Sequence, residues 1–196
     1  MSTLGDLTPL PRKFYARNTV EVARELLGCL LLRRLPDGEL LIARITETEA
    51  YDGPDDTACH GSRGLTPRTR TLFGPPGHAY VYLVYGMHEL FNIVTDRAGY
   101  PAGVLIRAVE PIQGEARMRM LRPVPRRNLA NGPGKLTRAL AITREHNGLD
   151  LTKAGIIWIS AGQAVPPWKI QCGPRIGIDY ADEAHRLAPW RFWISS

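Results

Sequence analysis

The sequence predicts a single α+β domain over residues 1–196, built around a twisted, largely antiparallel β-sheet with flanking helices. Three observations lead to this fold class. The 196 residues are enough for one domain with a buried core. Stretches with strand character outnumber helical ones and follow one another through short turns. No repeat or linker divides the chain. We expect residues 1–11 to be poorly ordered.

The first elements are predicted to be a helix and a hairpin. The helix covers residues 18–28, where Asn18 or Thr19 can cap the start and Gly28 can end the helix. Two strands follow over residues 29–51, and the dipeptide Asp37-Gly38 between them is a strong signal for a tight hairpin turn.

The second of these strands carries polar residues in an alternating pattern. Because strand side chains alternate between the two faces of a sheet, we expect Ile45, Glu47, Glu49 and Tyr51 to lie on one face. Two glutamates on one face are most often solvated. Here the strand ends in a loop that also contains a histidine, which makes a reaction centre a reasonable alternative.

The remaining elements are predicted by the same rules, with a turn-rich loop first. A helical turn is expected at residues 66–73, strands at 79–85, 90–96 and 102–111, helices at 112–121 and 132–142, and short strands at 155–160 and 189–195. Asn131 is the expected cap of the helix at 132–142.

The charge of the chain favours a polyanionic partner. The net charge is +6 with a pI near 9.5, and the 25 basic residues comprise 21 arginines and 4 lysines. Arginine binds phosphate through planar, bidentate hydrogen bonds, which suits nucleic acid. Codon usage can also produce arginine richness, so charge alone leaves both interpretations open.

The cysteines and the N-terminus indicate the compartment. The three scattered cysteines, Cys29, Cys59 and Cys172, do not form a disulfide framework, which favours a reducing environment. The chain shows no signal peptide and no apolar stretch long enough to span a membrane. We therefore expect a cytoplasmic protein, nucleoid-associated if bacterial, without a membrane partner.

The segment "ETEAYDGPDDTACHG", residues 47–61, places carboxylates beside Tyr51 and His60 in an otherwise basic chain. Asp52, Asp55 and Asp56 are expected to belong to a solvated turn, which leaves the tyrosine and the histidine unexplained. Cys59-His60 lacks the partner residues of a zinc motif. We predict no metal and no cofactor.

The segment "HAYVYLVYGMHELFN" places Tyr80 and Tyr82 on one strand face and Tyr85 at the following turn. Tyrosine is a good strand former, so sheet packing explains the first two. An exposed tyrosine at a turn suits stacking on nucleic-acid bases, or insertion between them, which contributes about 1–3 kcal/mol per base.

The stretch from Arg107 to Arg138 contains eight basic residues and two acids, Glu110 and Glu115. A solvated helix face with a charged loop explains this composition equally well. Within the stretch, "NGPGKL" provides a glycine-rich helix start with Lys135, which suits a single phosphate, but it lacks the spacing of a Walker loop.

Six blocks together resemble the alkyladenine (3-methyladenine) DNA glycosylase family. They are "ETEAYDGPDDTACH", "TPRTRTLFGPPG", "YVYLVYGMHELFN", "VLIRAVEP", "NGPGKL" and "PRIGI", in family order from about residue 12 to 194. The resemblance implies a monofunctional repair enzyme that flips an alkylated or deaminated purine out of duplex DNA and hydrolyses its N-glycosidic bond. A monomer suits the search along DNA that such an enzyme carries out.

The resemblance assigns roles to matching positions. Glu49 matches the general base that activates water, and Arg107 matches the arginine that helps to hold this water and the phosphate of the flipped nucleotide. Tyr51, His60 and Tyr82 match residues that sandwich the flipped base, and His60 also matches a donor to the sugar-phosphate. The remaining matches are Tyr85 as the intercalating residue, Asn92 as the side chain that crowds the guanine 2-amino group, and Leu105 and Ile178 as pocket-lining positions. Contacts with the DNA backbone are expected from Arg68, Arg70, Arg126, Arg127 and Lys135.

Two positions depart from the family pattern. Glu89 follows the intercalating turn, where a carboxylate would face phosphates, and Asp179 follows a pocket position, where an acid could change the substrate range.

Two other functions are compatible with parts of the sequence. A carbohydrate glycosidase could use Glu47 and Glu49, whose Cα atoms would lie roughly 7 Å apart on one strand face. A non-catalytic nucleic-acid-binding module would explain the arginines and tyrosines and would leave Glu49 without a role.

Overall fold

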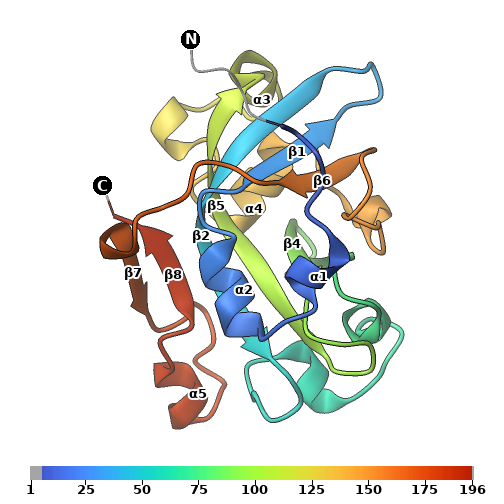
Figure 1. Ribbon diagram of the computed structural model, residues 1–196, viewed down its shortest axis with the longest axis vertical. Coiled ribbons are helices and arrows are strands. Elements are labelled where there is room, and N and C mark those ends of the chain that lie inside the picture. Colours follow the sequence, from blue (N-terminus) through green and yellow to red (C-terminus); the bar gives the residue numbers. More distant parts are fainter. Residues whose placement is uncertain (1–5, 196) are drawn as a thin grey trace.

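The computed structural model describes residues 6–195 and confirms the predicted α+β class. Its eight strands form one antiparallel sheet in the order β3-β4-β5-β2-β1-β6, and β8, which carries β7 on its outer edge, also pairs with β2 (Figure 1). The strands are β1 Leu30–Arg34, β2 Leu40–Asp52, β3 Ala79–Val84, β4 His88–Val94, β5 Ala102–Gln113, β6 Ile157–Ser160, β7 Ile170–Gly173 and β8 Arg191–Ile194.

Helices cover one face of the sheet and enclose the main core. Those that contribute buried residues to this core are α1 Arg12–Tyr15, α2 Thr19–Glu25, α3 Glu115–Leu121 and α4 Pro133–Ala139. Figure 1 shows α2 lying across β2 and β5. We call this side the core face; the opposite side of β2, β3, β4 and β5 is the cavity face.

The predicted N-terminal elements are confirmed. Helix α2 begins after Asn18, whose side chain accepts hydrogen bonds from the amides of Val20 and Glu21, as an N-cap should. Strands β1 and β2 pair as a hairpin around Asp37-Gly38, where Gly38 has a φ of +88°. The hairpin turn therefore forms where the glycine allows it.

The expectation that Ile45 shares a face with Glu47 and Glu49 is wrong. The pairing of β2 with β5 shifts register at this point, because Thr46 of β2 and Arg107 of β5 each lie opposite no partner. A bulge of this kind reverses the alternation of side chains. Ile45 consequently packs in the main core, and after the bulge it is Glu47, Glu49 and Tyr51 that lie on the cavity face, while Ala50 packs in the core.

Several short elements were not predicted. They are α1, β7, the helix α5 Glu183–Leu187 and the 3-10 turns η1 His60–Arg63, η3 Arg126–Asn128, η4 Arg144–His146 and η5 Pro167–Lys169. The helical turn predicted at 66–73 is present as the 3-10 turn η2 Arg70–Phe73, which begins later than predicted. Asn131 does not cap α4: Gly132 occupies the N-cap position before Pro133, and the Asn131 side chain accepts from Lys135.

The N-terminal segment is only partly within the described residues, because residues 1–5 lie outside them. Beyond that point, Leu10 donates to the carbonyl of Ile159, and the Leu7 carbonyl accepts from the side chains of Trp158 and Ser160. Between residues 6 and 195 no helix is long and apolar enough to cross a membrane.

Candidate active site

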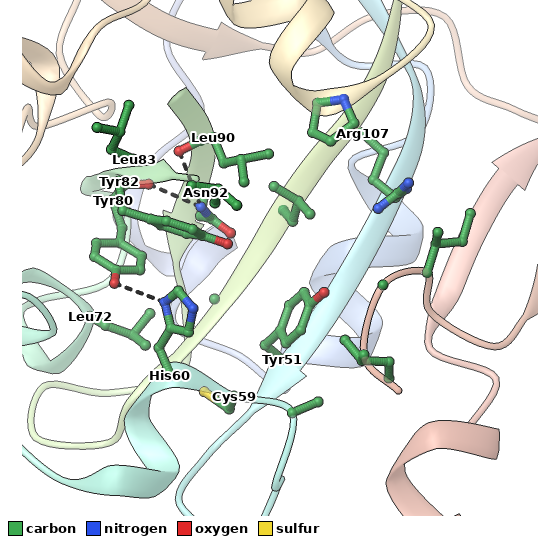
Figure 2. Close-up of a pocket in the computed structure, with 18 of the residues that line it drawn as sticks. Tyr51, Cys59, His60, Leu72, Tyr80, Tyr82, Leu83, Leu90, Asn92 and Arg107 are labelled. Atoms are coloured by element: carbon green, nitrogen blue, oxygen red, sulfur yellow. Dashed lines mark hydrogen bonds between the residues drawn. The ribbon is translucent and has the colours of Figure 1, made fainter. Parts of the chain in front are cut away.

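A cavity of about 520 Å³ opens on the cavity face. Most residues that line the cavity belong to β2, β3, β4 and β5, to the long loop between β2 and β3, and to the segment after β7. Figure 2 shows Tyr51 on one side and His60, Tyr80 and Tyr82 on the other. The cavity is therefore an aromatic slot large enough for a flat ring system.

Glu49 lies directly behind one wall of this cavity and is fully buried. Its Oε2 accepts hydrogen bonds from the Tyr51 hydroxyl (2.9 Å) and from Arg107 Nη1 (3.1 Å), and its Oε1 accepts from the amide of Ile176 (2.7 Å). All three donors line the cavity. A water molecule that reached Glu49 would have to pass between them.

Burial raises the pKa of Glu49, and the Arg107 charge together with the three hydrogen bonds opposes the rise. A carboxylate with a raised pKa is a stronger base once it is ionised. Glu49 thus has the environment of a general base.

Arg107 is the unpaired residue on β5 opposite the shifted register of β2. Its Nε donates to Glu47 Oε1 (3.2 Å) and its Nη1 to Glu49 Oε2. Glu47 Oε1 also accepts from Nη1 of Arg191 on β8 (3.1 Å). Glu47 and Glu49 thus lie on one face, as predicted, and the two bulges bring both of them onto a single guanidinium, which was not predicted.

Tyr51 is fixed from behind by a buried ion pair that the sequence did not predict. The Arg175 guanidinium lies 4.7 Å from the Tyr51 ring centroid and forms a bidentate pair with Asp56, with Nη2 at 2.8 Å from Oδ1. Arg175 also stacks against Trp190. Because Ile176 follows Arg175, the same ion pair fixes the amide that binds Glu49.

The expectation that the three aspartates of the loop are solvated is wrong for Asp56 and for Asp52. Asp56 is buried because it compensates the charge of buried Arg175. Asp52 is half-buried and accepts from Thr19 Oγ1, whereas Asp55 is exposed as predicted.

His60 is held on the opposite wall by a tightly docked turn. Cys59 donates through Sγ to the Pro101 carbonyl, and a Cβ added to Gly61 would lie 2.2 Å from the Pro101 Cβ, so only glycine allows this approach. The His60 Nδ1 lies 3.1 Å from the Tyr80 hydroxyl, and the ring packs edge-on at 4.4 Å from the Tyr82 ring.

Burial and the nearby charges of Arg68 and Arg63 lower the pKa of His60 to about 4. His60 is therefore neutral near pH 7, when one ring nitrogen carries a proton and the other is an acceptor.

Asn92 on β4 borders the same cavity. Its Nδ2 donates to the carbonyls of Tyr80 (3.1 Å) and Leu90 (3.4 Å), which leaves the side-chain oxygen directed away from these two acceptors. Leu105 and Ile178 are buried and contribute apolar surface to the walls. All predicted pocket positions thus meet in one place.

Tyr85 lies at the tip of the β3–β4 hairpin at the edge of the cavity and is 89% exposed. Tyr85 and Gly86 both have positive φ, 51° and 69°, as in the tight turns that close two-residue β-hairpins. Met87 beside them is also exposed. A side chain so placed loses no protein packing when it contacts another molecule.

A groove of about 940 Å³ lies on the other side of this hairpin. It shares Tyr85 and Pro133 with the cavity and carries the basic side chains of Arg122, Lys135 and Arg138. We refer to it as the basic groove.

The predicted backbone contacts fall in different places. Arg68 lines the cavity 5.5 Å from the Tyr82 ring, Lys135 lines the basic groove, and Arg70 is exposed on η2. Arg126 and Arg127 line neither space, and Arg126 is bound to Glu115.

The structure also shows where the two residues that depart from the family pattern lie. Glu89 lines the basic groove and accepts from the amide of Arg144, so part of its charge is already compensated. Asp179 is exposed and does not line the cavity, whereas its neighbour Tyr180 does. Within residues 6–195 no cluster of histidine, cysteine, aspartate and glutamate side chains could hold a metal ion.

Sequence reasoning missed Arg175, Arg191, Tyr80 and Ile176 as parts of the site. Arg175 and Ile176 belong to the "PRIGI" block, and a charged residue inside an otherwise apolar block was the available signal. Arg191 gave no signal in the sequence.

Comparison with known proteins gives consistent results. Residues 13–196 match the family model described as methylpurine-DNA glycosylase (MPG). A protein of Methanocella arvoryzae is 55% identical over 94% of this chain and 91% of its own length, and one of Myxococcus xanthus is 48% identical over 94% and 89%. A protein of Streptomyces avermitilis is 44% identical over 100% and 92%. Each of the three bears the name "Putative 3-methyladenine DNA glycosylase".

Proposed function

The chain belongs to the methylpurine-DNA glycosylase family, and on this premise we propose that it is a DNA repair glycosylase. It would flip an alkylated or deaminated purine out of duplex DNA and hydrolyse the N-glycosidic bond with an activated water, leaving an abasic site.

One observation carries the proposal: a buried carboxylate bound to an arginine lies directly behind an aromatic slot. Glu49 has a raised pKa, contacts Arg107, and is separated from the slot only by residues that line it. Tyr51 faces His60 and Tyr82 across the slot (Figure 2). A purine between these rings would bring its sugar to the carboxylate.

The reaction follows from this arrangement. As the bond between C1′ and the purine nitrogen breaks, its electron pair leaves with the base and the sugar becomes oxocarbenium-like. The oxygen of a water then bonds to C1′, and Glu49 accepts the water proton. The carboxylate also balances the positive charge on the sugar, and Arg107 holds the water and the phosphate of the flipped nucleotide.

Hydrolysis by water is favoured over Schiff-base chemistry. The four lysines of the chain, Lys13, Lys135, Lys153 and Lys169, are all within the described residues and none of them lines the cavity. A covalent imine needs an amine next to C1′. We therefore propose a monofunctional enzyme, which hydrolyses the N-glycosidic bond without forming a covalent imine.

The substrates would be damaged purines in double-stranded DNA. Cationic bases such as 3-methyladenine leave as neutral molecules, so a single carboxylate suffices. Neutral bases such as hypoxanthine also need a proton. The protein would act as a monomer in the cytoplasm, on the nucleoid if bacterial.

Base flipping costs a few kcal/mol, and stacking on aromatic rings can offset part of this cost. Tyr85, which is exposed at the hairpin tip, would fill the gap in the base stack. Arg68, Arg70 and Lys135 would contact the DNA backbone, and Arg126 and Arg127, which line neither the cavity nor the basic groove, would contribute less to this contact.

The geometry favours this function over the two alternatives. Glu47 and Glu49 bind the same guanidinium, whereas an inverting carbohydrate glycosidase needs its carboxylates on opposite sides of the substrate. A binding module would have no use for a buried carboxylate with a raised pKa behind the slot.

The test is excision by the purified full chain in EDTA. Duplexes that contain one hypoxanthine or 1,N6-ethenoadenine, and separately DNA that contains 3-methyladenine, are incubated and treated with alkali to cleave abasic sites. We expect Glu49→Gln to keep DNA binding and to lose excision, by about 10²–10⁴-fold for a general base.

Glu110→Gln, an exposed glutamate on β5, is the matched control and should retain excision. If the native chain binds these duplexes but cleaves no lesion, the catalytic proposal fails and the binding module becomes the better explanation.

A further inference from the structure

The hydrogen bonds around Glu49, together with the backbone from Pro174 to Ile176, form a closed ring that includes Glu47, to which the mechanism above gives no role. Glu49 Oε2 binds Arg107, Arg107 binds Glu47, and Glu47 binds Arg191. Arg191 Nε then donates to the carbonyl of Pro174 (2.9 Å), two residues before the amide that binds Glu49 Oε1. Four elements of the fold meet in this ring.

Resting on the proposed function, we propose that Glu47 is a positioning residue that holds the Arg107 guanidinium in its working orientation and shares its charge with Glu49. Glu47 itself would touch neither the substrate nor the water.

Geometry supports this role first. Arg107 donates through Nε and Nη1 to two different carboxylates, which fixes the plane of the guanidinium. Its Nη2 donates to no residue between 6 and 195, and Arg107 lines the cavity, so a donor remains for the substrate side. Without Glu47 the guanidinium could rotate about its bond to Glu49.

The local fold supports the role a second time. Glu47 faces Arg107 only because of the register shift at Thr46, and Arg107 is the residue left unpaired on β5. Bulges cost ladder hydrogen bonds and are common where a strand must re-aim a side chain near an active site. The two irregularities at Thr46 and Arg107 therefore serve the same contact.

The charges around Glu49 provide a measurable test, because the pKa of Glu49 should change if Glu47 acts through its charge and should not change if Glu47 only connects two strands. Glu49 is faced by Glu47 and Tyr51 on β2, Tyr82 on β3, Arg107 on β5, Arg191 on β8 and Arg175 after β7. Removing the negative charge of Glu47 would leave Arg107 to act on Glu49 alone. The ionised form of Glu49 would then be favoured, so its pKa would fall.

The experiment measures single-turnover excision against pH for the native full chain and for Glu47→Gln, with DNA saturating. The rate of the native chain should rise with pH as Glu49 ionises. For Glu47→Gln we expect the maximal rate to fall by about 10–100-fold, the range for partners that orient a reacting group, with unchanged DNA affinity.

The acid limb of the Glu47→Gln profile should also move to lower pH, since a less basic Glu49 ionises earlier. Glu47→Asp keeps the charge, so it should retain the native acid limb even if its rate falls. His60 has a pKa of about 4 and is held by Tyr80, so it does not account for a limb at higher pH.

The variant Arg191→Gln distinguishes a positioning role of Glu47 from a purely structural role in which Glu47 only connects β2 to β8. It breaks the same inter-strand contact but leaves the bond between Glu47 and Arg107. If Arg191→Gln and Glu47→Gln lose the same activity and neither moves the acid limb, Glu47 is only structural and the inference fails. If the native chain excises no lesion, the proposed function fails instead, which is a different result.

Discussion

The back wall of the cavity and the hairpin tip at its edge are built on opposite principles. In the back wall, Glu49, Asp56 and Arg175 are buried, and each makes several hydrogen bonds. At the tip, Tyr85 and Met87 are 89% and 73% exposed, and the backbone turns through positive φ at Tyr85 and Gly86. The wall is complete without a ligand, whereas the tip gains contacts only when another molecule arrives.

This difference matches two physical demands. A group that transfers a proton must be held within a fraction of an ångström of its target, and buried hydrogen bonds achieve this at the cost of desolvation. A group that enters a base stack must be accessible and must bring apolar surface with it. Removing a side chain from the wall should therefore lower the stability of the protein. Removing one from the tip should leave stability unchanged and impair function alone.

The largest effect should come from breaking the buried pair in the wall. Asp56→Ala leaves the Arg175 guanidinium buried without a counter-charge, so we expect a loss of about 3–5 kcal/mol in the free energy of unfolding. Excision should fall as well, because Arg175 packs on Tyr51 and fixes the Ile176 amide. Chemical denaturation followed by circular dichroism measures the first change.

Asp55→Ala is the matched control, since Asp55 is the exposed neighbour in the same loop. It should change stability by no more than about 0.5 kcal/mol. Equal effects of the two substitutions would mean that the ion pair does not support the wall.

At the tip the effect should be functional and smaller. Tyr85→Ala removes one ring that is 89% exposed, so the free energy of unfolding should change by less than about 0.5 kcal/mol. Excision from duplex DNA should fall by about 5–150-fold, which corresponds to about 1–3 kcal/mol of lost stacking. Single-turnover rates on a paired and on a mispaired lesion measure it.

The loss for Tyr85→Ala should be smaller with the mispaired lesion, because less pairing has to be broken. Trp168→Ala removes another exposed aromatic residue, which lines neither the cavity nor the basic groove, and should leave excision unchanged. An identical loss on both duplexes would show that Tyr85 does not assist flipping.

Local signals in the sequence predicted the elements that frame both regions. Asn18 caps α2, and Asp37-Gly38 turns the first hairpin, because these residues act through their own backbone neighbourhood. The exposed tip was also predictable, since Tyr85-Gly86 stands between two strand patterns. Alternation along β3 placed Tyr80 and Tyr82 on one face for the same reason.

The back wall depends on contacts that no local rule contains. The shift at Thr46 is set by pairing with β5, about sixty residues later in the chain, so simple alternation placed Ile45 on the wrong face. Asp56 appeared to belong to a solvated turn because its partner Arg175 is 119 positions away. The motif resemblance supplied Glu49 and Arg107, but the ring that connects them to Glu47 and Arg191 needed the structure.

The smallest expected effect is on the salt dependence of DNA binding, which shows which arginines and lysines contact the DNA backbone. The sequence predicts Arg126 and Arg127, yet Arg126 is engaged by Glu115, and both lie outside the cavity and the basic groove. Lys135 and Arg138 line the groove next to Tyr85. Each phosphate contact contributes about 0.9 to the slope of log affinity against log salt concentration.

We expect Lys135→Gln/Arg138→Gln to reduce that slope by about 1–2, and Arg126→Gln/Arg127→Gln to reduce it by less than about 1, with binding weakened equally for all sequences. Fluorescence anisotropy with undamaged duplex at several salt concentrations measures both. A larger change for the arginine pair would place the DNA over η3 and away from the basic groove. Tyr85 would then lie beside a DNA-binding surface that includes η3 instead of the basic groove. The comparison of wall and tip would have to include that surface.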